Sequence, residues 1–288
     1  MFVFPRRREI HCGMPKLNSS TLCYNRDIMQ ILHEPRIFLL ARQVIDEDAL
    51  RRFLDEEGMA WETDSDVPAE RIAEMAGRVC YMSFGKGRKS NEEYLKHILE
   101  VKHGSVTEHA VYTFLIAGVS RSLTHELVRH RAGWAYSQLS QRYVDESDCN
   151  FVEPDFVAAD PELHRMFLDV LDTIRPAYEK MTARLTEIIA KKYSEITDRT
   201  TLRKMARQAA RCILPNATET KIMVTANVRA LRHFIELRAN PAADLEIRKL
   251  AVMMCRIMQV EAPNLFGDYE IYALPDGTEA CRTQYQKV

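Results

Sequence analysis

Two apolar stretches of the chain have the composition of β-strands. Residues 36–44, RIFLLARQV, form a short apolar run that predicts a buried strand. Residues 110–119, AVYTFLIAGV, are rich in β-branched and aromatic side chains, which favour strands. Residues 137–144, SQLSQRYV, predict a return to extended structure. Strands are therefore few in the predicted fold.

Helix signals are more frequent along the first half of the chain. Residues 46–58, DEDALRRFLDEEG, predict a short helix, and a polar loop follows at residues 61–70. Residues 120–131, SRSLTHELVRHR, have apolar positions at helical spacing, and Gly133 then predicts a break.

Capping signals predict where one further helix begins and ends. Ser90 and Glu93 have the spacing of a capping box ahead of the segment YLKHILEVKHG. Gly104 closes this segment and predicts the end of the helix.

The second half of the chain predicts long helices. The pair Asp160-Pro161 is a strong start signal, with the aspartate as cap and the proline in the first turn. One apolar face then continues to about Tyr193, although Pro176 predicts a kink or a division. Its members are Leu163, Phe167, Val170, Leu171, Ile174, Met181, Leu185 and Ile188. The same signal at Asn240-Pro241 predicts a helix that ends before Pro263.

These elements predict an α+β fold in a single mixed domain, with a small, mainly antiparallel sheet and several long helices. Residues 1–33 lack sustained periodicity, so we expect a weakly structured N-terminal extension. Residues 34–270 then form the domain, and residues 271–288 a C-terminal tail.

Composition narrows the class of protein. The hydrophobic content is 46% and the charged content 28%, which is ordinary for a globular protein. The formal net charge is -1, so no global field attracts nucleic acid or an anionic membrane. The seven cysteines are odd in number and contain no CxxC pair, which indicates a reducing compartment. Without a signal peptide or a membrane-length apolar run, we expect a cytoplasmic protein that does not contact membranes.

Residues 129–142, RHRAGWAYSQLSQR, concentrate positive charge in this nearly neutral protein. The stretch holds three arginines, and no acid lies between Glu126 and Asp145. Clustered guanidinium groups tolerate each other best around an anion, and each fits phosphate or carboxylate with two hydrogen bonds. The neighbouring serines and glutamines could bind a polar heterocycle. The stretch therefore predicts a site for a nucleotide phosphate.

The histidines near this cluster do not predict a metal site. The sequence HELVRH resembles a zinc-protease motif, but His125 and His130 are five residues apart. On a helix that spacing separates them by about 140°, so they cannot share one metal from one face. We expect no metal centre.

Residues 210–238 form a second candidate segment, which we interpret as helical. Asn227 and Arg238 would then lie nearly in line, roughly 16 Å apart. Arg229 and His233 are four residues apart and would share a face. Such a helix could follow an elongated ligand, but this segment alone slightly favours an ordinary solvated face.

Taken together, four blocks resemble the flavin-dependent thymidylate synthases. RHR, SQLSQRY, ARCILP and NVRALRHFIELR occur in this order, and KHGSVTEHAVYTF and APNLFGDYE extend the likeness to roughly residues 70–270. One departure stands out. Eight residues separate Arg131 from Ser140, where the family commonly has seven.

The resemblance implies an activity and an assembly. Members of this family methylate dUMP at the uracil C5 with 5,10-methylenetetrahydrofolate, and FAD carries hydride from NADPH. They are homotetramers whose sites draw residues from more than one subunit.

The resemblance also implies roles for individual residues. Arg238 would lie against the uracil, favour its ionised form and act as the catalytic residue. The residues implied to bind dUMP are Glu126, Arg129, Gln138, Ser140, Arg142, Arg211 and Arg238. Those implied to contact FAD are Ser105, Arg129, His130, Arg131, Gln138, Asn227, Arg229 and His233.

Several alternatives remain open from the sequence. A related enzyme could transfer a one-carbon group to a different pyrimidine nucleotide, or the arginines could belong to a nucleic-acid-binding module. Near-neutral charge and the absence of stacking aromatics between basic residues disfavour the module. Cys212 lies beside Arg211 without an evident base, so we interpret it as a small buried apolar residue and expect Cys212→Ala to keep turnover.

Overall fold

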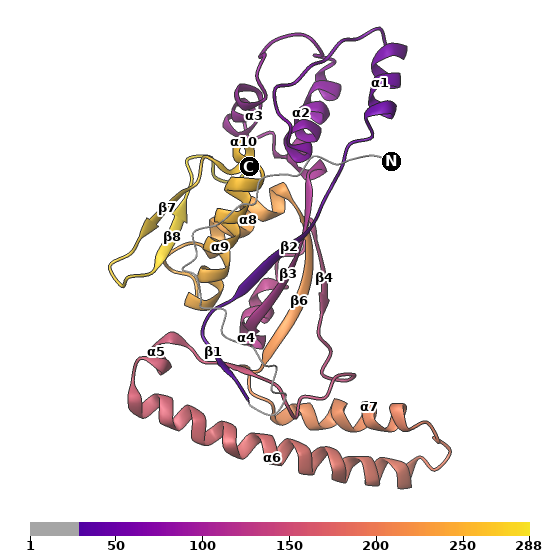
Figure 1. Cartoon of the computed structure of the whole chain (residues 1–288), viewed down its shortest axis with the longest axis vertical. Helices are drawn as coiled ribbons and strands as arrows, with labels where there is room; N and C mark the ends of the chain where they lie inside the picture. Colours follow the sequence, from indigo (N-terminus) through magenta and orange to yellow (C-terminus); the bar gives the residue numbers. More distant parts are fainter. Residues whose placement is uncertain (1–28) are drawn as a thin grey trace, which may run out of the picture.

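A four-stranded antiparallel sheet forms the centre of the molecule. The computed structural model describes residues 29–288, so most of the predicted extension at 1–33 lies outside the described residues. The strands β2 (Arg36–Arg42), β3 (Val111–Ser120), β6 (Glu219–Asn227) and β4 (Trp134–Gln138) lie in the order β2-β3-β6-β4. Figure 1 shows this sheet between two helical regions, with helices α1 to α3 at one end and α6 and α7 at the other. The predicted α+β fold is confirmed.

The sheet is apolar on both faces, but only one face is covered. Phe114 and Val224, paired across β3 and β6, are fully buried in the core. Their neighbours on the opposite face include Phe38 and Met223, which are 47% and 44% exposed. β2 is an edge strand of the sheet. The strand predicted at 36–44 is confirmed over residues 36–42, but none of its residues is buried, so the predicted burial was wrong.

Helices α4 (Arg121–Leu127), α8 (Val228–Arg238) and α9 (Leu245–Glu261) pack against the covered side of the sheet and supply much of the core. α4 ends at Leu127, earlier than the end at residue 131 that the sequence predicted. α9 begins after Asp244, whose side chain accepts from the Glu246 amide, while Asn240-Pro241 lies in a preceding turn. The predicted helix start at Asn240 was four residues early.

Residues 210–238 are not one helix. Residues 219–227 form the central strand β6, and Asn227 is the cap from which α8 begins. Asn227 is the N-cap of α8 and Arg238 is its last residue, so the two lie at opposite ends of one continuous helix, which agrees with the prediction for this part of the segment.

The first helical region contains α1 (Glu47–Glu56), α2 (Pro68–Tyr81), α3 (Asn91–Glu100), the 3-10 helix η1 (Gly104–His109) and α10 (Pro263–Phe266). α1 and the Ser90 cap of α3 confirm the predictions, since the Ser90 hydroxyl accepts from the Glu93 amide at 3.2 Å. Gly104 does not end α3 but starts η1. α2 was not predicted.

The second helical region contains α6 (Pro161–Lys192), which starts at the predicted Asp160 cap, and α7 (Arg199–Ala210), which was not predicted. α6 runs unbroken through Pro176. The short helix α5 (Asp155–Ala158) precedes it, the 3-10 helix η2 (Arg211–Ile213) follows α7, and β1 (Ile31–Leu32) pairs in parallel with β5 (Phe151–Val152).

Strands β7 (Glu270–Ala273) and β8 (Glu279–Arg282) form a hairpin in the segment predicted as a tail. Cys281 is buried in the core and Ile271 packs against it, so the hairpin shares the core of the domain. Within residues 29–288, no helix combines the length and apolarity needed to cross a bilayer.

Candidate active site

Arg238, at the end of α8, meets the turn that follows α4. Its Nε donates to His130 Nε2 at 3.1 Å, and one terminal nitrogen donates to Glu126 Oε2 at 2.5 Å. Glu126 lies in the last turn of α4, His130 in the turn that follows it, and Arg238 is the last residue of α8. Two acceptors therefore fix the plane of the Arg238 guanidinium.

His130 lies in a mostly aromatic environment. Its ring centroid is 5.3 Å from that of Phe234, 5.9 Å from His233 and 6.3 Å from Trp134. Burial lowers the pKa of His130 to about 4, and the positive charge of Arg238 adds to this effect. His130 is therefore neutral at pH 7. Because Nε2 accepts from Arg238, Nδ1 carries the proton.

Gly133 lets the turn containing Arg129 and Arg131 pack closely against the start of α8. Its φ is +75°, and a Cβ there would lie 2.7 Å from the Asn227 side-chain amide. The Asn227 side chain accepts from the Ala230 amide at 2.8 Å and caps α8. β4 begins at the next residue, Trp134, whose ring stacks on Tyr136 at 5.7 Å. Gly133 thus forms the turn that leads the chain into β4.

Several exposed basic side chains lie near the contact between Gly133 and Asn227. Arg129 and Arg131 are exposed, and their side chains make no hydrogen bond or ion pair with any residue from 29 to 288. His233 is also exposed on α8. Arg229 pairs with Glu108 of η1 at 2.5 Å, and Ser105 lies exposed in the same 3-10 helix.

A second cluster of arginines includes Arg121, the first residue of α4. A groove of about 270 Å³ is lined in part by Arg121 and His125 from α4 and by Arg211 from η2. Its remaining lining residues are Gln141, Gln208, Cys212, Leu214, Pro215 and Asn216. Burial lowers the pKa of Arg121, the charge of Glu146 at 3.5 Å opposes this effect, and the nearby charge of Arg211 adds to it. Glu146 therefore already offsets part of the positive charge at this groove.

Ser140 and Arg142 lie close to this groove in the chain, next to its lining residue Gln141. The Ser140 hydroxyl accepts from the Arg142 amide at 3.3 Å. The Nε atoms of Arg121, Arg142 and Arg207 are buried and have no acceptor among the described residues. Arg121 and Arg207 have acidic neighbours in Glu146 and Asp145, whereas the Arg142 side chain has no acid partner among residues 29–288. Because a buried donor without an acceptor costs free energy, the Nε of Arg142 is the atom here that would gain most from a bound acceptor.

The structure thus divides the predicted residues between two clusters. Glu126, His130, His233 and Arg238 lie together at the first, whereas Arg211 lines the second. Between residues 29 and 288 no hydrogen bond or ion pair joins the two, but α4 contributes to both. Gln138 lies between them on β4, where its amide nitrogen donates to Thr124 at 2.9 Å and Thr220 at 3.3 Å.

Arg121 and His125 were not among the predicted site residues. Both belong to the segment SRSLTHELVRHR, where positions 121 and 125 share a helix face. The spacing of four residues between them was the sequence signal that could have identified this pair. His125 and His130 point into different clusters, and no group of three or more potential metal ligands occurs within the described part of the chain.

Cys212 is exposed at the second groove, so its interpretation as a buried residue was wrong. It lies in the short helix η2, none of whose residues is buried. The apolar character of a thiol therefore did not predict its position, because η2 lies at the surface.

Both arginine clusters include acids, since Arg238 pairs with Glu126 and Arg121 lies 3.5 Å from Glu146. Residues 64–264 match the family described as thymidylate synthase complementing protein, and the chain belongs to this family. It is 50% identical over 226 residues to a flavin-dependent thymidylate synthase of Mycobacterium sp. (strain JLS), covering 77% of this chain and 88% of that protein. The enzyme of the same name from Mycobacteroides abscessus is 50% identical over 223 residues, with 76% and 86% covered.

A solved structure shares the fold at lower identity. It is that of a UMP/dUMP methylase, PolB from Streptomyces cacaoi, bound with 5-Br UMP. The TM-score is 0.57 at 20% sequence identity, and the match covers 83% of this chain and 96% of that one.

Proposed function

We propose that the protein is a flavin-dependent thymidylate synthase. It converts dUMP to dTMP, with 5,10-methylenetetrahydrofolate as carbon donor and NADPH as reductant through FAD. The observation that carries this proposal is the Arg238 guanidinium held by Glu126 and His130, in a chain 50% identical to enzymes of that name.

The second cluster fits the phosphate of dUMP. Arg142, Arg211 and Ser140 provide donors, and the buried Nε atoms of Arg121 and Arg142 have no acceptor among residues 29–288. Hydrogen bonds between a phosphate dianion and charged donors are worth about 2 kcal/mol each. We assign the nucleotide phosphate to this groove.

The first cluster fits a flavin. Its exposed donors Arg129, Arg131, Arg229, His233 and Ser105 suit a pyrophosphate and ring carbonyls, all of which accept hydrogen bonds. Asn227 would support this set through its contact with the Arg129–Arg131 turn. FAD, when bound, supplies the hydride chemistry that no side chain provides.

Arg238 acts on the uracil. A cation fixed beside the ring stabilises the negative charge that develops on it, and such electrostatic stabilisation commonly contributes most to the rate enhancement. Neutral His130 leaves the positive charge on Arg238, and Glu126 sets the direction of its remaining donors. No cysteine of the described chain lies at this cluster, and the thiol at the phosphate groove is Cys212.

The active protein is a homotetramer. The uncovered sheet face and the α6 surface expose apolar side chains, among them Phe38, Met223, Met166 and Val170 at 44–55%. Burial of this surface between subunits would stabilise an assembly. We propose that one subunit completes the site of another, which would bring the two arginine clusters into shared use. The cysteines of the described chain are free, which agrees with the cytoplasmic location that we propose.

A flavin spectrum followed by a product assay tests the function. The purified protein should show flavin absorbance that changes on titration with dUMP. Incubation with dUMP, methylenetetrahydrofolate and NADPH should give a product with the mass of dTMP. A colourless protein that binds no added FAD would contradict the proposal, and preferred methylation of UMP would favour the alternative of a related one-carbon enzyme.

A further inference from the structure

The loop between α2 and α3 carries a concentration of positive charge. Residues 83–90 have the sequence SFGKGRKS, in which Lys86, Arg88 and Lys89 are exposed. No acid occurs between Glu74 and Glu92, although the whole chain has a net charge of -1. None of the three basic side chains has a hydrogen bond or ion pair with any described residue. Their charge is available to a partner.

A buried arginine holds the backbone of this loop. Arg78 is 3% exposed and donates to the carbonyl oxygens of Ser83 at 3.0 Å, Lys86 at 3.1 Å and Arg88 at 2.9 Å. Its Nε donates to the fully buried Glu74 at 2.6 Å. One side chain thus holds three carbonyl groups of the loop.

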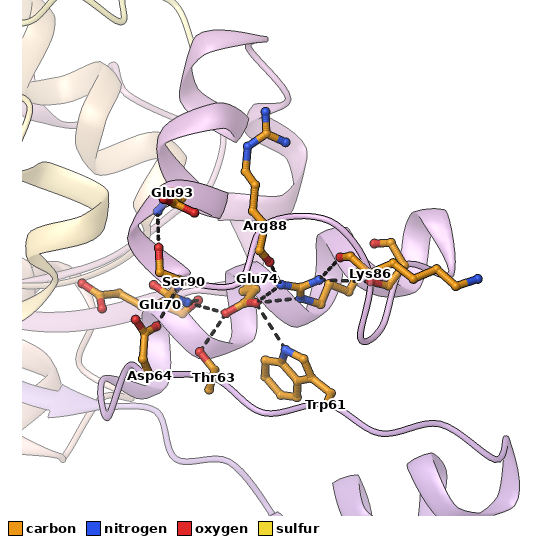
Figure 2. A network of polar contacts seen from close by, with 12 residues as sticks. Trp61, Thr63, Asp64, Glu70, Glu74, Lys86, Arg88, Ser90 and Glu93 are labelled. Atoms are coloured by element: carbon orange, nitrogen blue, oxygen red, sulfur yellow. Dashed lines mark hydrogen bonds and ion pairs between the residues drawn. The ribbon is translucent and has the colours of Figure 1, made fainter.

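Glu74 is fixed in turn by three further residues, two from the loop before α2 and one from α3. It accepts from the Trp61 indole at 3.2 Å, the Thr63 hydroxyl at 2.8 Å and the Asn91 amide at 2.8 Å. Figure 2 shows this network together with the loop above it. The Phe84 ring adds an apolar anchor, 6.2 Å from Trp61. The loop is therefore a preorganised element despite its glycines.

The direction of the carbonyls determines what the loop presents outward. Because they point inward to Arg78, the side chains of Lys86 and Arg88 extend away from the network, as Figure 2 shows. Gly85 and Gly87 permit this course with φ of +67° and +78°. Because the backbone is already fixed, only the Lys and Arg side chains have to be ordered when an anion binds, which lowers the entropy cost of binding.

The exposure of the loop selects the shape of that anion. Lys86, Gly87, Arg88 and Lys89 all protrude, so they do not enclose a compact phosphate. Cations in a row on a protruding loop instead match an extended, flexible chain of carboxylates. α2, which leads into the loop, contacts the segment before η1: the Tyr81 hydroxyl lies 3.2 Å from His103, and η1 carries Ser105.

We propose that the loop Ser83–Ser90 binds the γ-linked oligoglutamate tail of the folate co-substrate. This inference rests on the proposed function, which supplies the folate. Lys86, Arg88 and Lys89 pair with successive carboxylates of the tail, while the reacting end of the folate occupies the site.

The test compares folates that carry one or five glutamates. We expect the natural protein to have about a tenfold lower KM for the pentaglutamate, which three exposed ion pairs can supply. In Lys86→Gln/Arg88→Gln/Lys89→Gln this preference should vanish, with unchanged kcat and unchanged KM for dUMP and NADPH. The preference of the natural protein should also weaken at high salt.

A matched control replaces three exposed lysines of α6, at the far end of the molecule in Figure 1, as Lys180→Gln/Lys191→Gln/Lys192→Gln. It should retain the preference. Equal KM values for both folates in the natural protein, or a rise in the NADPH KM of the loop variant, would overturn the inference. Binding of labelled penta-γ-glutamate, measured by fluorescence anisotropy without turnover, separates the two proposals. If the natural protein binds the peptide and the loop variant does not, the anion site stands even where the thymidylate assay fails.

Discussion

Arg238 donates to two acceptors that come from a single turn of the chain. Glu126 and His130 are four residues apart and both face the guanidinium. A guanidinium held in this way has fewer orientations open to it, so its free donors are aimed before a ligand arrives. Glu126 and His130 thus orient Arg238, whether or not they also contact a ligand themselves.

Removal of one acceptor should mainly affect the rate. We expect Glu126→Ala to lower kcat by at least about tenfold, because Arg238 loses its fixed orientation at the transition state. Glu126→Gln keeps an acceptor oxygen and should retain more of the rate. Steady-state kinetics with varied dUMP will measure both. Glu47→Ala, which breaks the exposed ion pair with Arg71, is the control, and a Glu126 effect confined to KM would contradict the positioning role.

Removal of Arg238 itself separates catalysis from cofactor binding. Arg238→Ala should abolish methylation, because no other cation replaces the charge beside the uracil, while flavin stays bound through the residues around the RHR turn. Flavin absorbance and product formation, measured on the same sample, check both halves. Near-normal turnover would show that Arg238 is not catalytic.

His130 should make stability depend on pH. Its pKa is about 4 in the folded chain and about 6.5 in the unfolded chain, so the unfolded chain binds a proton first. The free energy of unfolding should therefore be highest above pH 6.5 and decrease as the pH falls toward 4. His130→Gln, which accepts from Arg238 but does not titrate, should remove this component. Urea midpoints at pH 7 and pH 5 for both proteins measure it, and parallel pH dependence would contradict the assignment.

At the scale of elements, capping signals were more informative than apolar periodicity. Asp46, Ser90 and Asp160 cap the predicted helices because a side-chain oxygen beside a free amide acts locally. The residues of β6 were interpreted as helical, although their burial alternates with the period of a strand: Ile222, Val224 and Ala226 are buried, and the residues between them are not. Its pairing with β3 and β4 is non-local, so local sequence does not determine it.

The network beneath the loop between α2 and α3 was not predicted for a related reason. Glu74 and Arg78 have ordinary charged spacing on a helix, which is typical of a solvated face. Only the packing of Trp61, Asn91 and the 83–90 loop around them makes this pair buried. α2 itself was obscured by the polar run before Pro68, although proline in a first turn was its available signal.

Arg78→Met should destabilise the fold strongly. It leaves Glu74 buried without its cationic partner and releases three loop carbonyls, and breaking a buried ion pair costs about 3–5 kcal/mol. Glu74→Gln/Arg78→Met should recover part of that loss, because it removes the unpaired charge. Urea unfolding of the three proteins measures the free energies. A single variant within about 1 kcal/mol of the natural protein would show that the network contributes little.

At the scale of the whole molecule, the sequence predicted which segments contribute to the site but not how they are divided. The RHR turn and the end of α8 do meet, as the order of the blocks implied. Arg211 instead lines a separate groove together with Arg121, and α4 contributes residues to both clusters. If the two clusters meet only across a contact between subunits, sequence patterns within one chain would not predict that arrangement, because contacts between subunits depend on exposed surfaces.

The surface of α6 tests the proposed assembly. Leu163, Met166 and Val170 are spaced three and four residues apart on the helix, and they are 44%, 55% and 55% exposed. If this stripe is buried between subunits, Met166→Glu/Val170→Glu places two charges in an apolar contact and should convert the tetramer to smaller species. Light scattering after size-exclusion chromatography measures the mass, and the helix content should stay constant in circular dichroism. Arg165→Glu, an exposed neighbouring change, is the control. Because the sites are proposed to draw on more than one subunit, activity should fall together with the mass, and a fully active monomer would refute both the assembly and the shared sites.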